Sequence, residues 1–317
     1  MRILKYAFKR FMLAILTVWT LFTLTFFLMR SVPGDPLTKT KEIPEETRKN
    51  LEARYGLDKP LIDQYFIQLN HVFIKGDLGT SFRTIGREVN EIIREQFPVS
   101  ASVGLFAIAF GVPLGLILGT LAALKRNSWM DRLVSLYCVT GIALPSFLIA
   151  YLIQYFIAVY PLVNLGVDPN FWFRPAGWGE KRDLVLPGLT LSFGIVATIS
   201  RMMRAQMVEI GFSEYIKTAK AKGMSVLRMI LFHQFRNAIL PIVSILGPLF
   251  VGVLGGSLLV ESIFGLPGLG RAYLSSIQNS DYNVIMGLTI FFGTFLILVT
   301  FVTDIVYGLV DPRIRLS

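Results

Sequence analysis

The chain is poor in the side chains on which soluble enzymes and metalloproteins depend. Only 16% of its 317 residues are charged and 53% are hydrophobic, whereas globular proteins carry about a quarter charged residues. A single cysteine, Cys138, excludes an intramolecular disulfide framework and a cysteine-based metal site. The two histidines, His71 and His233, lie far apart in the sequence. This composition indicates a chain embedded in lipid and excludes an ordinary soluble enzyme.

A nucleotide-binding loop is also missing. The sequence contains no Gly-Lys dipeptide, and the phosphate-binding loop G-x-x-x-x-G-K-[ST] requires one. We therefore predict that the chain is not an enzyme and that it carries no catalytic, cofactor-binding or metal-binding residue. Any ATP that drives it is hydrolysed on another protein.

What the sequence does contain is six uncharged, apolar runs. Each is long enough, or nearly so, to cross a hydrocarbon core of about 30 Å as a helix. The first run, residues 11–29, could belong to a signal peptide, but it exceeds the usual apolar length of about 7 to 15 residues and lacks a small-residue cleavage site. The predicted fold is an all-α integral membrane protein with six transmembrane helices, the first within residues 1–30 and the others at 98–124, 133–160, 184–203, 237–260 and 282–307.

The distribution of charge gives these helices an orientation. With six spans both termini lie on one side, and the segments on that side carry 16 Lys and Arg residues against 5 Asp and Glu. We predict that this side is cytoplasmic, because basic residues are retained there. The same distribution accounts for the formal charge of +10 without nucleic-acid binding. Residues 31–97 are then an extracytoplasmic segment, 98–307 the membrane core, 204–236 a cytoplasmic loop within it, and 308–317 a cytoplasmic tail.

The uncharged runs themselves contain no Asp, Glu, Lys, Arg or His; they are residues 11–29, 98–124, 133–160, 184–200, 237–260 and 282–303. Ion-driven carriers usually bind their coupling ion through ionisable groups or broken helices near the midplane, and an intramembrane enzyme needs reactive side chains there. The absence disfavours both classes and favours transport driven by another subunit. A stand-alone channel or secondary carrier remains the less favoured alternative.

Small and polar residues in the runs are candidates for helix packing and for the transport pathway. Gly111, Gly115 and Gly119 recur every four residues and share one helical stripe, where missing side chains let two helices approach closely. Polar residues in such helices more often make interhelical hydrogen bonds than touch cargo. Five of them are candidate pore-lining residues: Gln154, Ser192, Thr198, Ser244 and Ser257.

Residues 213–223, between the fourth and fifth spans, are predicted to form one short helix. Ser213 is a plausible N-cap, Glu214 lies at the positive end of the helix dipole, and Gly223 can adopt the left-handed conformation that ends a helix. The following residues, 225–238, alternate apolar and polar side chains and indicate an amphipathic segment. From charge alone, the lysines could simply anchor this loop to anionic lipid.

Six short stretches are typical of one family of membrane proteins. In order along nearly the whole chain they are VPGDP at 32–36, YGLDKP at 55–60, GDLGTSF at 76–82, TAKAKG at 218–223, ESIFGLPGLG at 261–270 and LVDPRIR at 309–315. Through them the chain resembles the permease subunits of binding-protein-dependent ABC importers, specifically the oligopeptide/dipeptide/nickel group and its OppB/DppB-like branch.

The resemblance implies a type I ABC importer permease that pairs with a second, homologous permease as a heterodimer. It implies two cytoplasmic ATPase subunits, which bind ATP and Mg, an extracytoplasmic solute-binding protein, and membrane lipid as further partners. The loop after the fourth span then corresponds to the EAA loop, whose short helix docks on the ATPase; its pattern is only partly kept. The residues to which the resemblance assigns ATPase coupling are Glu214, Tyr215, Lys217, Thr218, Ala219, Lys220, Ala221, Lys222 and Gly223.

The function implied is ATP-driven import of oligopeptides or dipeptides across the plasma (inner) membrane of a prokaryote. Nickel chelates and oligosaccharides are alternatives, because the external binding protein makes most of the selection in such importers. Residues 31–97 are expected to receive the loaded binding protein or to shape the mouth of the pore.

Overall fold

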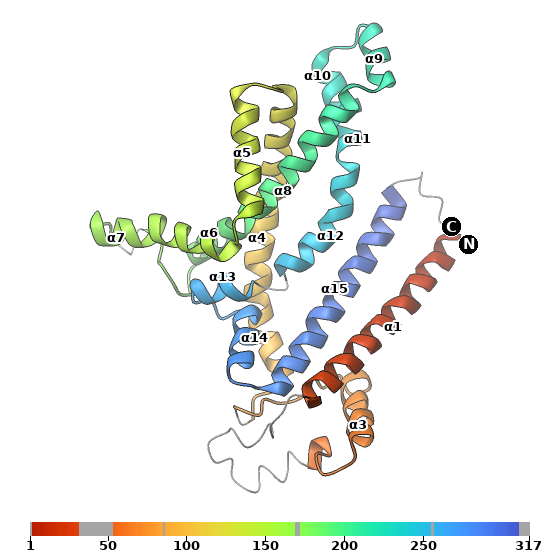
Figure 1. The fold of residues 1–317 in the computed structure, drawn as a ribbon, viewed down its shortest axis with the longest axis vertical. Coiled ribbons are helices and arrows are strands. Elements are labelled where there is room, and N and C mark those ends of the chain that lie inside the picture. Colours follow the sequence, from red (N-terminus) through yellow and green to blue (C-terminus); the bar gives the residue numbers. More distant parts are fainter. Residues whose placement is uncertain (1, 32–52, 85, 169–171, 255–256, 311–317) are drawn as a thin grey trace. The chain divides into compact units, whose positions relative to one another are not determined.

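The computed structural model describes residues 2–31, 53–84, 86–168, 172–254 and 257–310 (Figure 1). These residues are mainly helical, and their one β pairing is an isolated bridge between Thr80 and Glu88. Among them, six helical stretches are long and apolar enough to cross a membrane: Phe8–Ser31, Val89–Leu124, Ser146–Asn164, Lys181–Gly211, Leu240–Ile263 and Tyr282–Thr303. The predicted all-α fold with six apolar helices is confirmed.

The chain divides into two compact units. Two of the three divisions fall inside helices α4 (Val89–Leu124) and α15 (Tyr282–Val310), and the third lies between Leu266 and Pro267. Unit 1 comprises Met1–Val99 and Pro267–Phe301, and unit 2 comprises Ser100–Leu266 and Val302–Ser317. Of the predicted segments, residues 32–52, which include the VPGDP stretch, and residues 311–317 of the tail lie outside the described residues.

Unit 1 contains α1 (Arg2–Ser31), α3 (Leu61–Phe73) and α14 (Leu269–Gln278), with the adjoining parts of α4 and α15. Its aromatic core joins α1 to α3 through Phe22, Phe26 and Tyr65. The Tyr65 hydroxyl also lies 2.9 Å from that of Thr23. Part of the segment that follows the first span is therefore packed against that span.

Unit 2 is organised around α8 (Val185–Gly211), which follows the short 3-10 helix η2 (Lys181–Leu184). One face of α8 is fully buried through Ile199, Met203 and Met207, which belong to a hydrophobic cluster of this unit. The other helices of unit 2 are α5 (Trp129–Ala143), α6 (Ser146–Ile153), η1 (Gln154–Val159), α7 (Tyr160–Asn164), α9 (Glu214–Ala221), α10 (Val226–Met229), η3 (Ile230–Phe235), α11 (Arg236–Ala238), α12 (Leu240–Leu254) and α13 (Leu258–Ile263).

The third span differs from its predicted bounds of 133–160. Helix α5 ends at Ala143, Leu144 is extended, and α6 begins after Pro145 in a new direction (Figure 1). The cause is local, because the ring of a proline disfavours helical geometry in the residue before it. The stretch with the length and apolarity of a span is Ser146–Asn164, which includes the π-helical turn η1.

Candidate functional site

Helix α9 is short and begins at a defined N-cap. Ser213 has the extended conformation of that position, but its hydroxyl donates to the carbonyl of Ile210 at 2.6 Å and caps no helix amide. Glu214 lies in the first turn, where the helix dipole favours a negative charge. Its carboxylate accepts a hydrogen bond from Lys217 at 2.8 Å. Both side chains are exposed, so this pair adds little stability.

The other end of α9 is closed by Gly223, whose φ is +76°. Its amide donates to the carbonyl of Lys220, and the amide of Met224 donates to the carbonyl of Ala219. These two bonds form a Schellman motif and satisfy carbonyls that the helix end would leave unpaired. Only glycine adopts this backbone conformation without strain between β-carbon and carbonyl, so the sequence fixes where α9 ends.

Two side chains attach α9 to the rest of unit 2, and most of the others face outward. Ile216 and Ala219 are buried, whereas the remaining predicted coupling residues are exposed. The exposed set is Glu214, Tyr215, Lys217, Thr218, Lys220, Ala221, Lys222 and Gly223. Helix α9 thus has an exposed, predominantly basic surface.

The segment that follows α9 returns to α8 and packs there. The buried side chain of Gln234, in η3, donates to the carbonyl of Met207 in α8 at 2.5 Å. The side-chain Nδ2 of Asn237 donates to the hydroxyl of Tyr215 at 3.3 Å, which links this segment to α9. Four apolar side chains of the segment are exposed, namely Val226, Leu227, Leu231 and Phe232.

The glycines of α4 lie against α8. A β-carbon built on Gly111 would lie 3.0 Å from Cβ of Ile195. At Gly119 the same β-carbon would lie 2.5 Å from the carbonyl oxygen of Ser200. The Ser200 hydroxyl donates to the carbonyl of Gly115 at 3.1 Å, a bond that the close approach of the two backbones allows. The stripe therefore acts in helix packing, by the mechanism typical of membrane helices.

Helices α5 and α8 are joined by an ion pair that the sequence did not indicate. Asp131, which is 4% exposed, accepts two hydrogen bonds from the Arg204 guanidinium: Nε to Oδ1 at 2.5 Å and Nη2 to Oδ2 at 2.8 Å. Oδ2 also accepts from the amide of Asn127 at 2.9 Å. The hydrogen bonds from Arg204, together with that amide, lower the pKa of Asp131 to about 2.

This pKa predicts how the ion pair depends on pH. Because the pKa in the folded chain lies below the ordinary 3.8, the stabilisation is present above about pH 4 and is lost as the pH falls toward about 2. The thermal unfolding midpoints of the wild type and of Asp131→Asn should therefore differ by a constant amount between about pH 5 and pH 8, and converge below about pH 4. A difference that changes between pH 5 and 8 would contradict the assignment.

The five candidate pore-lining residues do not form one group. Gln154 donates to the carbonyls of Pro175 and Ile263 at 2.8 and 2.9 Å, and Ser257 is the N-cap of α13. Ser192 and Ser244 donate to carbonyls of their own helices, and Thr198 is half-buried in α8. In this structure the first four use their polar groups to hold the backbone.

A network in unit 1 was also missed by sequence reasoning. It centres on the GDLGTSF stretch, residues 76–82. Asp77 accepts from Arg54 at 2.8 Å and lies 3.1 Å from Nδ1 of His71. Burial alone would raise the pKa of Asp77, but the hydrogen bonds from Arg54, the Gly79 amide and His71 outweigh it and lower the pKa. The sequence indicated no chemical role for His71. Its contact with Asp77 gives it a structural role in this network.

The same stretch is attached to the turn between α14 and α15. Buried Asp281 accepts hydrogen bonds from the Ser81 hydroxyl and from the amide of Phe82. Asn283 donates to the carbonyl of Thr80 at 3.1 Å. The partners are about 200 positions apart in the sequence, so no local pattern could have revealed them.

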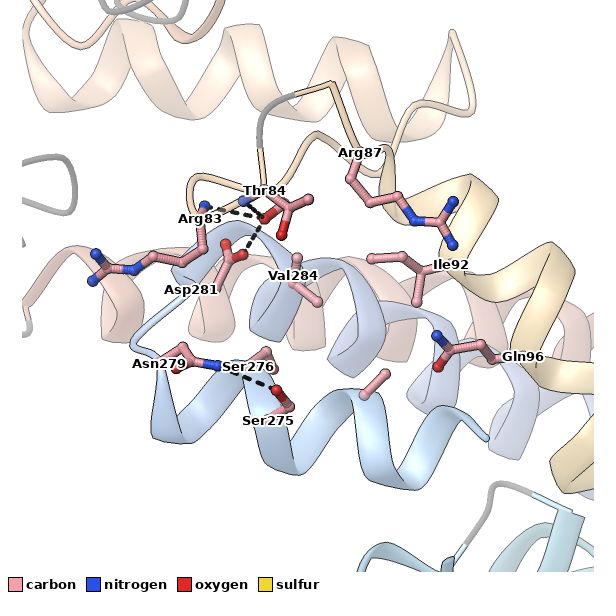
Figure 2. A pocket seen from close by; sticks show the side chains of 12 residues that line it. Arg83, Thr84, Arg87, Ile92, Gln96, Ser275, Ser276, Asn279, Asp281 and Val284 are labelled. Atoms are coloured by element: carbon pink, nitrogen blue, oxygen red, sulfur yellow. Dashed lines mark hydrogen bonds between the residues drawn. The ribbon is translucent and has the colours of Figure 1, made fainter. Parts of the chain in front are cut away.

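A cavity of about 270 Å³ lies beside this attachment (Figure 2). Its wall includes Arg83, Arg87, Gln96, Asn279 and Asp281. Figure 2 shows the Arg83 and Arg87 side chains directed away from one another. Arg87 is paired with Glu95, and the described residues contain no cluster of potential metal ligands.

Comparison with known proteins identifies the chain. Residues 111–316 match the family of inner membrane components of binding-protein-dependent transport systems, and residues 3–104 match the N-terminal family of such membrane components. The chain belongs to this family. The permease is therefore a multi-pass inner membrane protein and a non-catalytic subunit of an ABC importer, which implies ATPase and substrate-binding partners.

The permease has close relatives over its full length. It is 43% identical to the "Oligopeptide transport system permease protein OppB" of Haemophilus influenzae, covering 98% of this chain and 99% of that protein. It is 42% identical to the "Dipeptide transport system permease protein DppB" of Bacillus subtilis, covering 98% of each. It is 38% identical to the OppB protein of Escherichia coli K12, covering 98% and 99%.

A solved structure supports the fold. The inward-facing MetNI methionine ABC transporter matches 70% of the permease and 96% of the compared chain, with a TM-score of 0.52 and 18% sequence identity. At this identity the likeness concerns the fold, which is that of an ABC importer permease.

Proposed function

We propose that the permease forms half of an ATP-driven import pathway for peptides, either oligopeptides or dipeptides. The observation that carries this proposal is the similarity over 98% of the chain to relatives named as oligopeptide and dipeptide permeases. A second, homologous permease completes the pathway as a heterodimer. An extracytoplasmic solute-binding protein delivers the peptide, and two ATPase subunits bind ATP and Mg on the cytoplasmic side, where both termini of the permease lie.

Helix α9 is the element through which the ATPases act. The Schellman motif at Gly223 fixes where this short helix ends, and its exposed surface is available for docking. Closure of the ATPases displaces α9, and the displacement reaches α8 through Phe212 and Ser213, which alone separate the two helices. The membrane helices then move as rigid bodies and alternate the access of the pathway.

The extracytoplasmic segment, residues 31–97, receives the loaded binding protein. Its described part is held on α1 by the aromatic core around Tyr65 and on α15 through Asn283. Several large apolar side chains of α3 and its end stay exposed and suit a protein surface: Leu61, Ile62, Phe66, Phe73 and Ile74.

Disruption of that surface tests the assignment. We expect the double substitution Ile62→Asp/Phe66→Asp to reduce uptake by about tenfold or more, because charge at an apolar contact costs several kcal/mol. The loaded binding protein should also fail to stimulate ATP hydrolysis, while basal hydrolysis and membrane insertion are retained. Arg94→Asp, at an exposed residue of α4 that is not part of this surface, is the control. Normal stimulation of the double variant would remove this role.

The substrate class is tested in the assembled importer. Vesicles that contain both permeases and both ATPases, supplied with ATP and the binding protein, should accumulate labelled di- or oligopeptides. Unlabelled peptide should compete for uptake, whereas a nickel chelate or an oligosaccharide should not. Competition by one of those compounds, with no effect of peptide, would establish the alternative substrate.

A further inference from the structure

The end of α8 that leads into α9 is held by three other elements of unit 2. Helix α4 reaches it through Gly119, whose added β-carbon would lie 3.1 Å from the amide nitrogen of Arg204. Segment η3 reaches it through Gln234 and the carbonyl of Met207. Helix α5 reaches it through the two-bond pair between Asp131 and Arg204. A force applied to α9 therefore enters a helix end that is fixed on several sides.

The turn between α4 and α5 makes two contacts at this place. Asp131 holds the guanidinium of Arg204 and, through the amide of Asn127, the turn itself. Arg126, in the same turn, lies over the ring of Phe212 at 5.7 Å from its centre. Phe212 is one of the two residues between α8 and α9. The turn thus contacts both the end of α8 and the connection through which α9 is attached.

The chemistry of the Asp131–Arg204 pair suits a mechanical joint. A guanidinium bound to a carboxylate by two parallel bonds fixes orientation as well as distance, which a single lysine contact does not. Burial of the carboxylate reduces screening by salt. Further along the same two helices, the Tyr137 hydroxyl donates to the carbonyl of Phe193 at 3.1 Å. The centroids of the Tyr137 and Phe193 rings are 4.6 Å apart. Helices α5 and α8 are consequently joined at two separate levels.

We propose that Asp131 and Arg204, with Arg126 on Phe212, are positioning residues that make α4, α5 and α8 move as one body when α9 is displaced. This inference rests on the proposed function, because it assigns a path to the motion that the ATPases impose on α9. Without the joint, displacement of α9 bends the end of α8. The displacement then does not reach the rest of α8 or helices α4 and α5.

Transport per ATP tests the joint in the assembled importer. The double substitution Asp131→Asn/Arg204→Gln removes both charges, so neither partner is left buried and unpaired. We expect it to assemble and to keep basal ATP hydrolysis, while peptide moved per ATP falls by about tenfold. Arg204→Lys keeps the positive charge but loses the two parallel hydrogen bonds of the guanidinium. It should give an intermediate reduction in peptide moved per ATP. Arg201→Gln, an exposed residue one turn earlier on α8, is the control and should transport normally.

A distance measurement separates a joint from a merely stabilising pair. Spin labels at Trp129→Cys in α5 and Glu209→Cys in α8 replace exposed residues, in a Cys138→Ala background that removes the single native cysteine. The interlabel distance should be the same in the nucleotide-free and ATP-trapped wild type, and should change between these states in the double variant.

Wild-type transport per ATP in the double variant, or a nucleotide-dependent distance in the wild-type background, would overturn the proposal. Failure of the proposed function has a different signature, because the wild-type complex would then move no peptide. The distance measurement needs only nucleotide and the assembled complex, so it decides on the joint in that case as well.

Discussion

Replacing Gly223 by proline should strongly reduce peptide uptake while the ATPase subunits continue to hydrolyse ATP. The backbone at Gly223 has φ +76°, whereas a proline ring holds φ near about −65°. Proline also lacks the amide that donates to the carbonyl of Lys220. Both changes destroy the Schellman end of α9, so the docking helix loses its defined length. We expect uptake to fall by about 5- to 150-fold, the range of typical coupling free energies.

The control for this substitution is Gly166→Pro. Gly166 is also exposed, has φ +64°, and would place a β-carbon in open space, as Gly223 would. It follows α7, away from the segment that contains α9 in the sequence. The measurement is labelled-peptide uptake together with ATP hydrolysis in the reconstituted complex. Coupled uptake at the wild-type level in Gly223→Pro would show that α9 does not transmit the motion.

Substituting Gly119 by alanine should destabilise the membrane core of unit 2. The new β-carbon would lie 2.5 Å from the carbonyl oxygen of Ser200 and 2.7 Å from Cβ of Met203, so the two helix backbones must separate. Overpacking of this kind costs about 1 to 3 kcal/mol. We expect a lower thermal unfolding midpoint and a reduced yield of assembled complex.

Two other glycines calibrate this effect. Gly111→Ala should cost less, because its closest contact is 3.0 Å and involves a side chain. Gly252→Ala, in α12, places its β-carbon in open space and should be neutral or slightly stabilising, since alanine favours a helix over glycine by about 1 kcal/mol. We expect the thermal unfolding midpoint to be lowest for Gly119→Ala, higher for Gly111→Ala and highest for Gly252→Ala. Equal midpoints for the three variants would show that the stripe does not control how closely α4 and α8 pack.

The features that could be predicted from the sequence are those encoded locally. Continuous apolar runs identify helices in lipid because backbone groups there have no other partner. Gly223 could be expected at the end of α9 because a left-handed residue after a helix is usually glycine. The spacing of Gly111, Gly115 and Gly119 also indicated a packing face, because the periodicity of a single helix places these residues on one side.

The features that could not be predicted depend on partners distant in the sequence. Asp131 and Arg204 are 73 positions apart, and nothing near either residue specifies the other. Gln154 was a candidate for the pore because it is polar within an apolar run, yet its amide holds the carbonyls of Pro175 and Ile263. The end of α5 at Ala143 was hidden because the apolar run continues through Pro145, although a proline there disfavours helix in the residue before it.

The central claim is that this permease is a passive gate that is moved by ATP hydrolysed on separate subunits. The most direct test compares sealed vesicles that contain the permease alone with vesicles that contain the complete importer, both given ATP, the binding protein and a labelled peptide. We expect accumulation above the external concentration only with the complete importer, and none when ATP is replaced by a non-hydrolysable analogue. Sustained accumulation by the permease alone would contradict the claim.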